Sequence, residues 1–140
     1  MSAPLSEQEA FAALEQLYAE ADMALASLGA ACDACGACCR FAEFEHVLMC
    51  TNLEAALLIA RHGEPPRPCS ASACGFHVSG RCIARAGRPL ACRTFLCSRL
   101  AGTAAQRRMD VHERIHRRIQ ILCRQWINGY RYGPLWALTS

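Results

Sequence analysis

The feature that most constrains this chain is the segment CDACGACC, which places four thiols, Cys32, Cys35, Cys38 and Cys39, within eight residues. Seven further cysteines bring the total to eleven in 140 residues. A small domain with so many thiols usually gains stability from disulfides or from bound metal. The cysteines are therefore expected to be part of the fold.

The expected compartment decides between these two possibilities. The N-terminal stretch MSAPLSEQEAFAALEQLYAE has neither the basic region nor the unbroken apolar run of a secretory signal. We therefore expect a cytoplasmic protein, in which reduced thiols favour metal ligation or redox chemistry over structural disulfides. An odd number of cysteines also fits disulfides poorly. No apolar run approaches the roughly 20 residues that span a bilayer, so no membrane anchor is expected.

The length predicts a single domain over residues 1–140. A capping box at Ser6 and Glu9 begins a predicted helix over about 7–28, in which apolar residues repeat at helical spacing. A second capping box, at Thr51 and Glu54, begins a short helix that ends before Gly63.

The remaining segments are expected to be less regular until the C-terminal region. Residues 41–48 are predicted to be extended, and residues 69–97 to form loops and turns because Gly, Ser and Pro lie between the thiols. An apolar stripe opposite a basic face predicts an amphipathic helix over about 104–128. The apolar residues of the last eleven positions should fold this tail back onto the domain.

Charge is unevenly distributed along the chain. Residues 1–60 carry a net charge of −8, whereas residues 61–140 carry +11. We expect the acidic and basic helices to attract each other within one fold. Nucleic-acid binding is the weaker alternative and is not expected, because a basic face is necessary but not sufficient for it.

The spacing of the first thiols favours a metal centre. A C-x2-C turn brings two sulfurs within reach of one ion, and Cys32, Cys35 and Cys38 extend it to the spacing of three ligands of a ferredoxin-type [4Fe-4S] cluster. The fourth position of that run is Ala42, so a further ligand must come from Cys39 or from the distant group. Two metal sites or one bridged cluster would use the adjacent Cys38 and Cys39.

The two cysteine groups together resemble the YkgJ-type cysteine-cluster family, the zinc- or iron-chelating CxxCxxCC domain. In that family a CxxCGxCC element precedes C-x-F, G-x-C-x-I and R-P-x-x-C-R-x-F-x-C. The matching markers here include Gly36, Phe76, Ile83, Pro89 and Phe95. The eight matching thiols are Cys32, Cys35, Cys38, Cys39, Cys74, Cys82, Cys92 and Cys97.

This resemblance covers roughly residues 30–97 and implies a cytoplasmic bacterial metal-chelating domain. Family members that include flagellin lysine N-methylases suggest an iron-sulfur cluster, but the resemblance supplies no reaction. The chain departs from the pattern at Gly75, where proline is common, and at Ala84, where an aromatic residue is common. Cys50, Cys69 and Cys123 have no counterpart in it.

We therefore predict a mainly α, small single domain, with two or three helices around a loop-rich, cysteine-ligated metal centre formed by residues 32–39 and 74–97. The predicted function is that of an iron-sulfur protein, with a [4Fe-4S] cluster, that acts in electron transfer, redox sensing or an accessory step. The alternative is a zinc-stapled module for protein interaction or metal handling. All-cysteine sites suit both metals, and the sequence identifies neither a catalytic residue nor a protein partner.

Arg88 and Arg93 flank Cys92 in the segment RPLACR and have two possible roles. Each guanidinium could donate hydrogen bonds to thiolate sulfur or neutralise an anionic cluster, which would make both residues cofactor-binding. The alternative is an ion pair with the acidic N-terminal half or a hydrogen bond to a loop carbonyl.

Two histidine patterns offer further metal ligands. His77 follows Cys74 by three residues and could complete a mixed Cys/His site. His112, Glu113 and His116 spell the H-E-x-x-H pattern of zinc peptidases, but no His, Asp or Glu follows them to supply a third ligand. Packing between helices or at the surface is the favoured role for this second pair.

Overall fold

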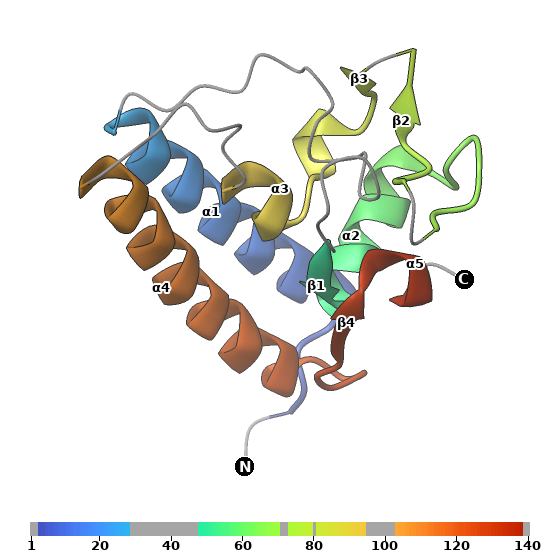
Figure 1. Ribbon diagram of the computed structural model, residues 1–140. Coiled ribbons are helices and arrows are strands. Elements are labelled where there is room, and N and C mark those ends of the chain that lie inside the picture. The colour runs from blue at the N-terminus through green and yellow to red at the C-terminus, as the bar shows by residue number, and fades with distance from the viewer. Residues whose placement is uncertain (1–2, 29–47, 71–72, 80, 95–102, 139–140) are drawn as a thin grey trace.

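The computed structural model describes residues 3–28, 48–70, 73–79, 81–94 and 103–138. Two long helices, α1 (Glu7–Ala26) and α4 (Thr103–Gln125), lie side by side and run in opposite directions (Figure 1). The short helix α3 (Leu90–Thr94) contacts both of them. The fold is mainly α, as the sequence predicts.

The helix starts follow the capping signals in the sequence. The Ser6 hydroxyl accepts the backbone N–H of Glu9 at 3.2 Å, and the Glu9 carboxylate accepts the N–H of Ser6 at 3.1 Å. Thr51 and Glu54 form the same reciprocal pair at the start of α2 (Asn52–His62). Gly63 then ends α2 with a φ of 72°, a conformation that favours glycine.

A small antiparallel sheet ties the middle of the chain to its C-terminal tail. Strand β1 (Met49–Thr51) pairs with β4 (Tyr132–Pro134), with Cys50 opposite Gly133. The short helix α5 (Leu135–Leu138) follows β4, and Leu135 is fully buried. The tail therefore folds back onto the domain, as expected from its apolar residues.

The described part of the second cysteine group contains only short elements. Strands β2 (His77–Val78) and β3 (Arg81–Cys82) form a two-residue hairpin ladder, followed by the single 3₁₀ turn η2 (Arg85–Gly87) and by α3. This confirms the predicted predominance of loops and turns between residues 69 and 94. The predicted extended segment 41–48 falls almost wholly outside the described residues, and the observed strand β1 begins at Met49.

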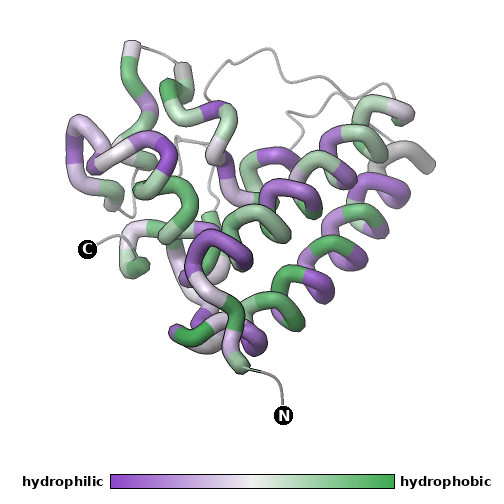
Figure 2. Tube along the Cα trace, turned by 180° about the vertical axis from the view of Figure 1, so that it is seen from behind, coloured by the Kyte–Doolittle hydropathy of each residue, from purple (hydrophilic) through white to green (hydrophobic). Residues whose placement is uncertain are grey.

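The buried side chains of the described residues form two apolar clusters. The larger one, the helical core, joins α1, α2, α3 and α4, and polar and apolar residues alternate along the two long helices (Figure 2). The smaller one, the thiol cluster, joins α2, β1, the hairpin, α3 and α5. Its buried members are Leu48, Cys50, Ala55, Leu58, Cys74, Phe76, Ala84, Cys92 and Leu135, with Cys69 and Cys82 partly buried against them.

The acidic and basic halves of the chain form ion pairs with each other in the fold. Arg118 of α4 pairs with Glu20 of α1, Arg61 of α2 with Glu15, and Arg93 of α3 with Asp22. Each of these ion pairs joins the acidic first half of the chain to the basic second half, as expected. The Arg61–Glu15 and Arg118–Glu20 pairs are about half exposed, so each contributes at most about 1 kcal/mol.

Candidate metal centre

The described thiols of the second cysteine group gather in the thiol cluster. Cys74 and Cys92 are each 6% exposed, and Cys82 is partly buried against the cluster to which both belong. These three residues are among the eight predicted ligands. The other five predicted ligands, Cys32, Cys35, Cys38, Cys39 and Cys97, lie outside the described residues.

Two thiols outside the eight predicted ligands join the same cluster. Cys50 is 1% exposed beside Leu48, and Cys69 packs against the cluster from the Pro-rich connector. The sequence gives one signal for these positions: Cys50 is close to apolar residues, and Cys69 is close to Cys74. Cys123 instead lies fully buried in the helical core, apart from the thiol cluster.

Cys69 is held beside Cys74 by a tight turn. The Ser70 N–H donates to the Ala73 carbonyl at 3.0 Å, and the Gly75 N–H donates to the Cys69 sulfur at 3.3 Å. A Cβ at Gly75 would lie 1.9 Å from the Arg67 carbonyl oxygen, so the turn requires glycine. Proline at this position would also remove the N–H.

The hairpin places Cys82 next to His77. These two residues are directly opposite in the antiparallel ladder, so their side chains lie on one face. The His77 N–H donates to the Cys74 carbonyl at 3.1 Å. This hydrogen bond closes a turn that holds Cys74 next to the hairpin. Among the residues that the structure describes, however, no group of three or more Cys, His, Asp or Glu side chains is arranged to hold one ion.

Burial strongly affects the thiol chemistry of the cluster. It raises the pKa of Cys50 well above its ordinary value, and the nearby Glu54 carboxylate and Cys74 thiol raise it further. A buried, unligated Cys50 is therefore a neutral thiol at physiological pH. A metal ion would reverse this preference, because it binds the deprotonated form.

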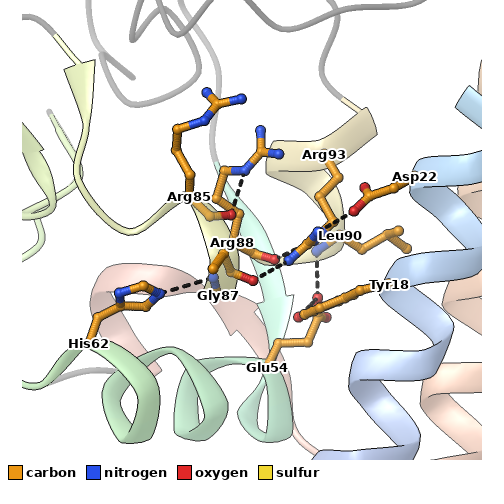
Figure 3. Close-up of polar contacts among 10 residues, drawn as sticks. Tyr18, Asp22, Glu54, His62, Arg85, Gly87, Arg88, Leu90 and Arg93 are labelled. Carbon is orange, nitrogen blue, oxygen red and sulfur yellow. Dashed lines mark hydrogen bonds and ion pairs between the residues drawn. The ribbon is translucent and has the colours of Figure 1, made fainter. Parts of the chain in front are cut away.

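Arg93 is held by the protein rather than left open toward the cluster. Its guanidinium donates to Asp22 at 2.7 Å, to the Ala86 carbonyl at 2.7 Å and to the Arg88 carbonyl at 2.8 Å (Figure 3). It also stacks 4.1 Å from the ring centre of Tyr18. An acidic residue and loop carbonyls are the partners expected if Arg93 has a structural role and does not bind a cofactor. A direct contact of Arg88 or Arg93 with a cofactor stays a prediction.

A buried carboxylate contacts the start of α3, the helix that carries Cys92. Glu54, 1% exposed, accepts hydrogen bonds from the Tyr18 hydroxyl at 3.0 Å and the Leu90 N–H at 2.7 Å (Figure 3). Its other oxygen accepts the Thr51 N–H at 3.1 Å. Capping predicts the contact with Thr51 from the sequence, but no local signal predicts those with Tyr18 and Leu90.

The H-E-x-x-H residues show packing contacts on α4. The rings of His112 and His116 stack with their centres 5.9 Å apart, and His116 packs on Tyr132. His112 Nδ1 lies 2.7 Å from the Thr94 hydroxyl. Burial, with the neighbouring His116 and Arg108, lowers the pKa of His112. No third donor joins the pair within the described part of the chain.

Comparisons with known proteins do not extend this description: no family model matches the chain, and searches of curated proteins and of solved structures find no significant match. Within the described ranges, no helix has the length and hydropathy needed to cross a membrane. The assignment of function therefore depends on the residues themselves.

Proposed function

We propose that this chain is a metal-binding cysteine-cluster protein that holds an iron-sulfur cluster and acts in electron transfer, redox sensing or an accessory redox step. The observation that carries the proposal is the convergence of Cys74, Cys82 and Cys92 in one largely buried apolar cluster. Leu48, which directly follows the undescribed segment 29–47 with its four thiols, belongs to the same cluster.

The chemistry of the donors supports a soft metal centre. Thiolate sulfur is the ligand of iron-sulfur clusters and of structural zinc. An apolar shell of the kind formed by Phe76, Ala84 and Leu135 limits solvent access, which is one determinant of a cluster's potential. When bound, an iron-sulfur cluster would supply one-electron transfer.

A zinc-stapled module for interaction or metal handling is the second candidate. The described residues between 69 and 94 form two-residue strands, one 3₁₀ turn and one five-residue helix, all of them short elements. A metal ion bound by both Cys39 and Cys74 would close a loop of about 35 residues. Structural zinc can contribute on the order of 10 kcal/mol to folding. Both candidates predict that metal removal destabilises this region.

Paired alanine variants test the proposal. The Cys92→Ala protein, purified without oxygen, is expected to lose most of its bound iron or zinc, because Cys92 belongs to both the motif and the thiol cluster. The Cys123→Ala protein is the matched control, since Cys123 is equally a buried thiol but lies in the helical core. Equal metal content in the two variants and in the wild type would contradict the assignment of Cys92. Far-ultraviolet circular dichroism verifies that α1 and α4 stay folded.

A further inference from the structure

The second half of α4 and the segment that follows it carry positive charge that the fold leaves uncompensated. Residues 114–140 contain no Asp or Glu but five arginines, Arg114, Arg117, Arg118, Arg124 and Arg131. Arg118 pairs with Glu20 of α1, whereas the other four are exposed and form no ion pair with a described residue. A surface with several unpaired guanidinium groups attracts anionic partners.

Three of these arginines share one face of α4. Arg114, Arg117 and Arg124 lie at helical spacing with Ile121 between them, opposite the side of α4 that packs in the helical core. We call these four residues the arginine face. Within the described residues, neither acidic residue of α4, Asp110 or Glu113, forms an ion pair with it. Figure 1 shows α4 at the edge of the molecule, away from the hairpin of β2 and β3.

A groove beside the arginine face adds an apolar surface to it. The groove lies between α1 and α4 and has a volume of about 370 Å³. Leu17 of α1 and Ile121 and Leu122 of α4 supply much of its apolar lining, and the Glu20–Arg118 ion pair also lines it. The Ile121 side chain is 56% exposed. An aliphatic side chain therefore faces solvent among the unpaired arginines.

The chemistry of this surface fits a protein partner better than a nucleic acid. Protein interfaces commonly combine an apolar centre with a polar rim and are enriched in arginine. Surfaces that bind single-stranded nucleic acids present aromatic rings on which bases stack. The centre here is the aliphatic Ile121, and the ring of Tyr130 is covered by the Arg124 guanidinium, 5.5 Å from the ring centre. A groove between two helices suits an amphipathic helix.

We propose that the arginine face and the groove between α1 and α4 bind an acidic amphipathic helix of a partner protein. Carboxylates of that helix pair with Arg114, Arg117 and Arg124, and one of its apolar side chains enters the groove beside Ile121. The charges speed association and select an acidic partner, whereas the apolar contact slows dissociation. The inference is independent of the proposed function, because the arginine face contains none of the predicted metal ligands.

Fluorescence anisotropy with a labelled helical peptide tests this surface. The peptide carries a row of leucines flanked by glutamates, and the full-length protein, purified without oxygen, is titrated into it. We expect saturable binding that weakens about tenfold or more as the ionic strength rises from about 0.01 M to about 0.15 M.

Three variants at exposed positions locate the binding surface. Arg117→Glu should weaken binding about tenfold. Arg107→Glu is the matched control, because it makes the same change of charge at an exposed residue about 15 Å away along α4, and it should weaken binding about twofold or less. Ile121→Ser keeps the charge but removes the apolar contact and should weaken binding about tenfold at both ionic strengths. Circular dichroism should show unchanged helix content in all three.

Four results would contradict the inference. Absence of saturable binding at the lower ionic strength overturns it. Equal losses in Arg107→Glu and Arg117→Glu would show that overall charge alone attracts the peptide. An unchanged affinity of Ile121→Ser would overturn the role of the groove. A single-stranded DNA oligonucleotide that binds the wild type more tightly than the peptide, and loses affinity in Arg117→Glu, would identify a nucleic-acid surface.

Discussion

The hydroxyl of Tyr18 in α1 donates a 3.0 Å hydrogen bond to the buried carboxylate of Glu54 in α2. The same carboxylate oxygen accepts the N–H of Leu90 at the start of α3. One side chain therefore connects three helices at the boundary between the helical core and the thiol cluster. The position of Cys92, two residues after Leu90, depends on this connection.

Replacement of Glu54 should destabilise the whole domain. Glu54→Ala leaves the Tyr18 hydroxyl and the Leu90 N–H buried without their acceptor, so we expect a loss of about 3 kcal/mol in the free energy of unfolding. Tyr18→Phe removes a single donor and should cost about 1 kcal/mol. Chemical denaturation measures both values, and a Glu54→Ala protein as stable as the wild type would refute this role.

Tyr18 should also make stability depend on alkaline pH. Burial, followed by the nearby Glu54 carboxylate, raises the pKa of Tyr18 well above its ordinary value. The neutral phenol is thus favoured in the folded protein, and its contribution is complete below the pKa of the unfolded state, about 10. It declines as pH rises above that value, where the unfolded chain ionises first.

The measurement compares the wild type with Tyr18→Phe. The stability advantage of the wild type should shrink between about pH 9 and pH 11, as linkage requires. An advantage that stays constant over this range would show that Tyr18 does not titrate differently in the two states.

The helices were largely predictable because their signals are local. Two capping boxes and a 3.6-residue apolar period predict helices over 7–28, from Thr51 to Gly63 and over 104–128, and the observed bounds differ by at most three residues. The predicted attraction between the acidic and basic halves is likewise confirmed by the ion pairs of α1. Each of these features depends on residues close in sequence or on simple charge balance.

The long-range contacts were not predictable from the sequence. The pairing of β1 with β4 joins residues about 80 positions apart through three-residue strands, which are too short to show a period. The turn at Cys69 and the buried contacts of Glu54 likewise depend on tertiary packing. The motif predicts eight ligands, and the three that the structure describes belong to one apolar cluster without forming a group that could hold an ion.

Arg93 should act on stability through its fixed partners. Arg93→Lys keeps a positive charge near Asp22 but cannot donate to both the Ala86 and Arg88 carbonyls in the geometry of a guanidinium. We expect a loss of about 1–3 kcal/mol. Asp22→Asn is the control: Asp22 is 48% exposed, so removing its charge should cost less than about 1 kcal/mol. Equal effects of the two variants would contradict the importance of the carbonyl contacts.

Gly75 should be intolerant of any side chain. Its Cβ would lie 1.9 Å from a backbone oxygen, so Gly75→Ala must displace the turn at Cys69 and should cost about 1–3 kcal/mol and reduce metal retention. Gly133→Ala is the matched control, since a Cβ there meets nothing within 4 Å and should be neutral or slightly stabilising. Thermal melts of the metal-loaded proteins compare them, and equal melting temperatures would argue against the crowding at Gly75.

The iron, zinc and acid-labile sulfide content of protein purified without oxygen, together with its visible spectrum, tests the central claim most directly. The proposed function predicts a coloured protein that contains iron and sulfide in about equal amounts. Zinc without sulfide would contradict the iron-sulfur assignment and favour the stapled module. A colourless protein that lacks both metals and binds neither on addition would contradict the metal centre itself.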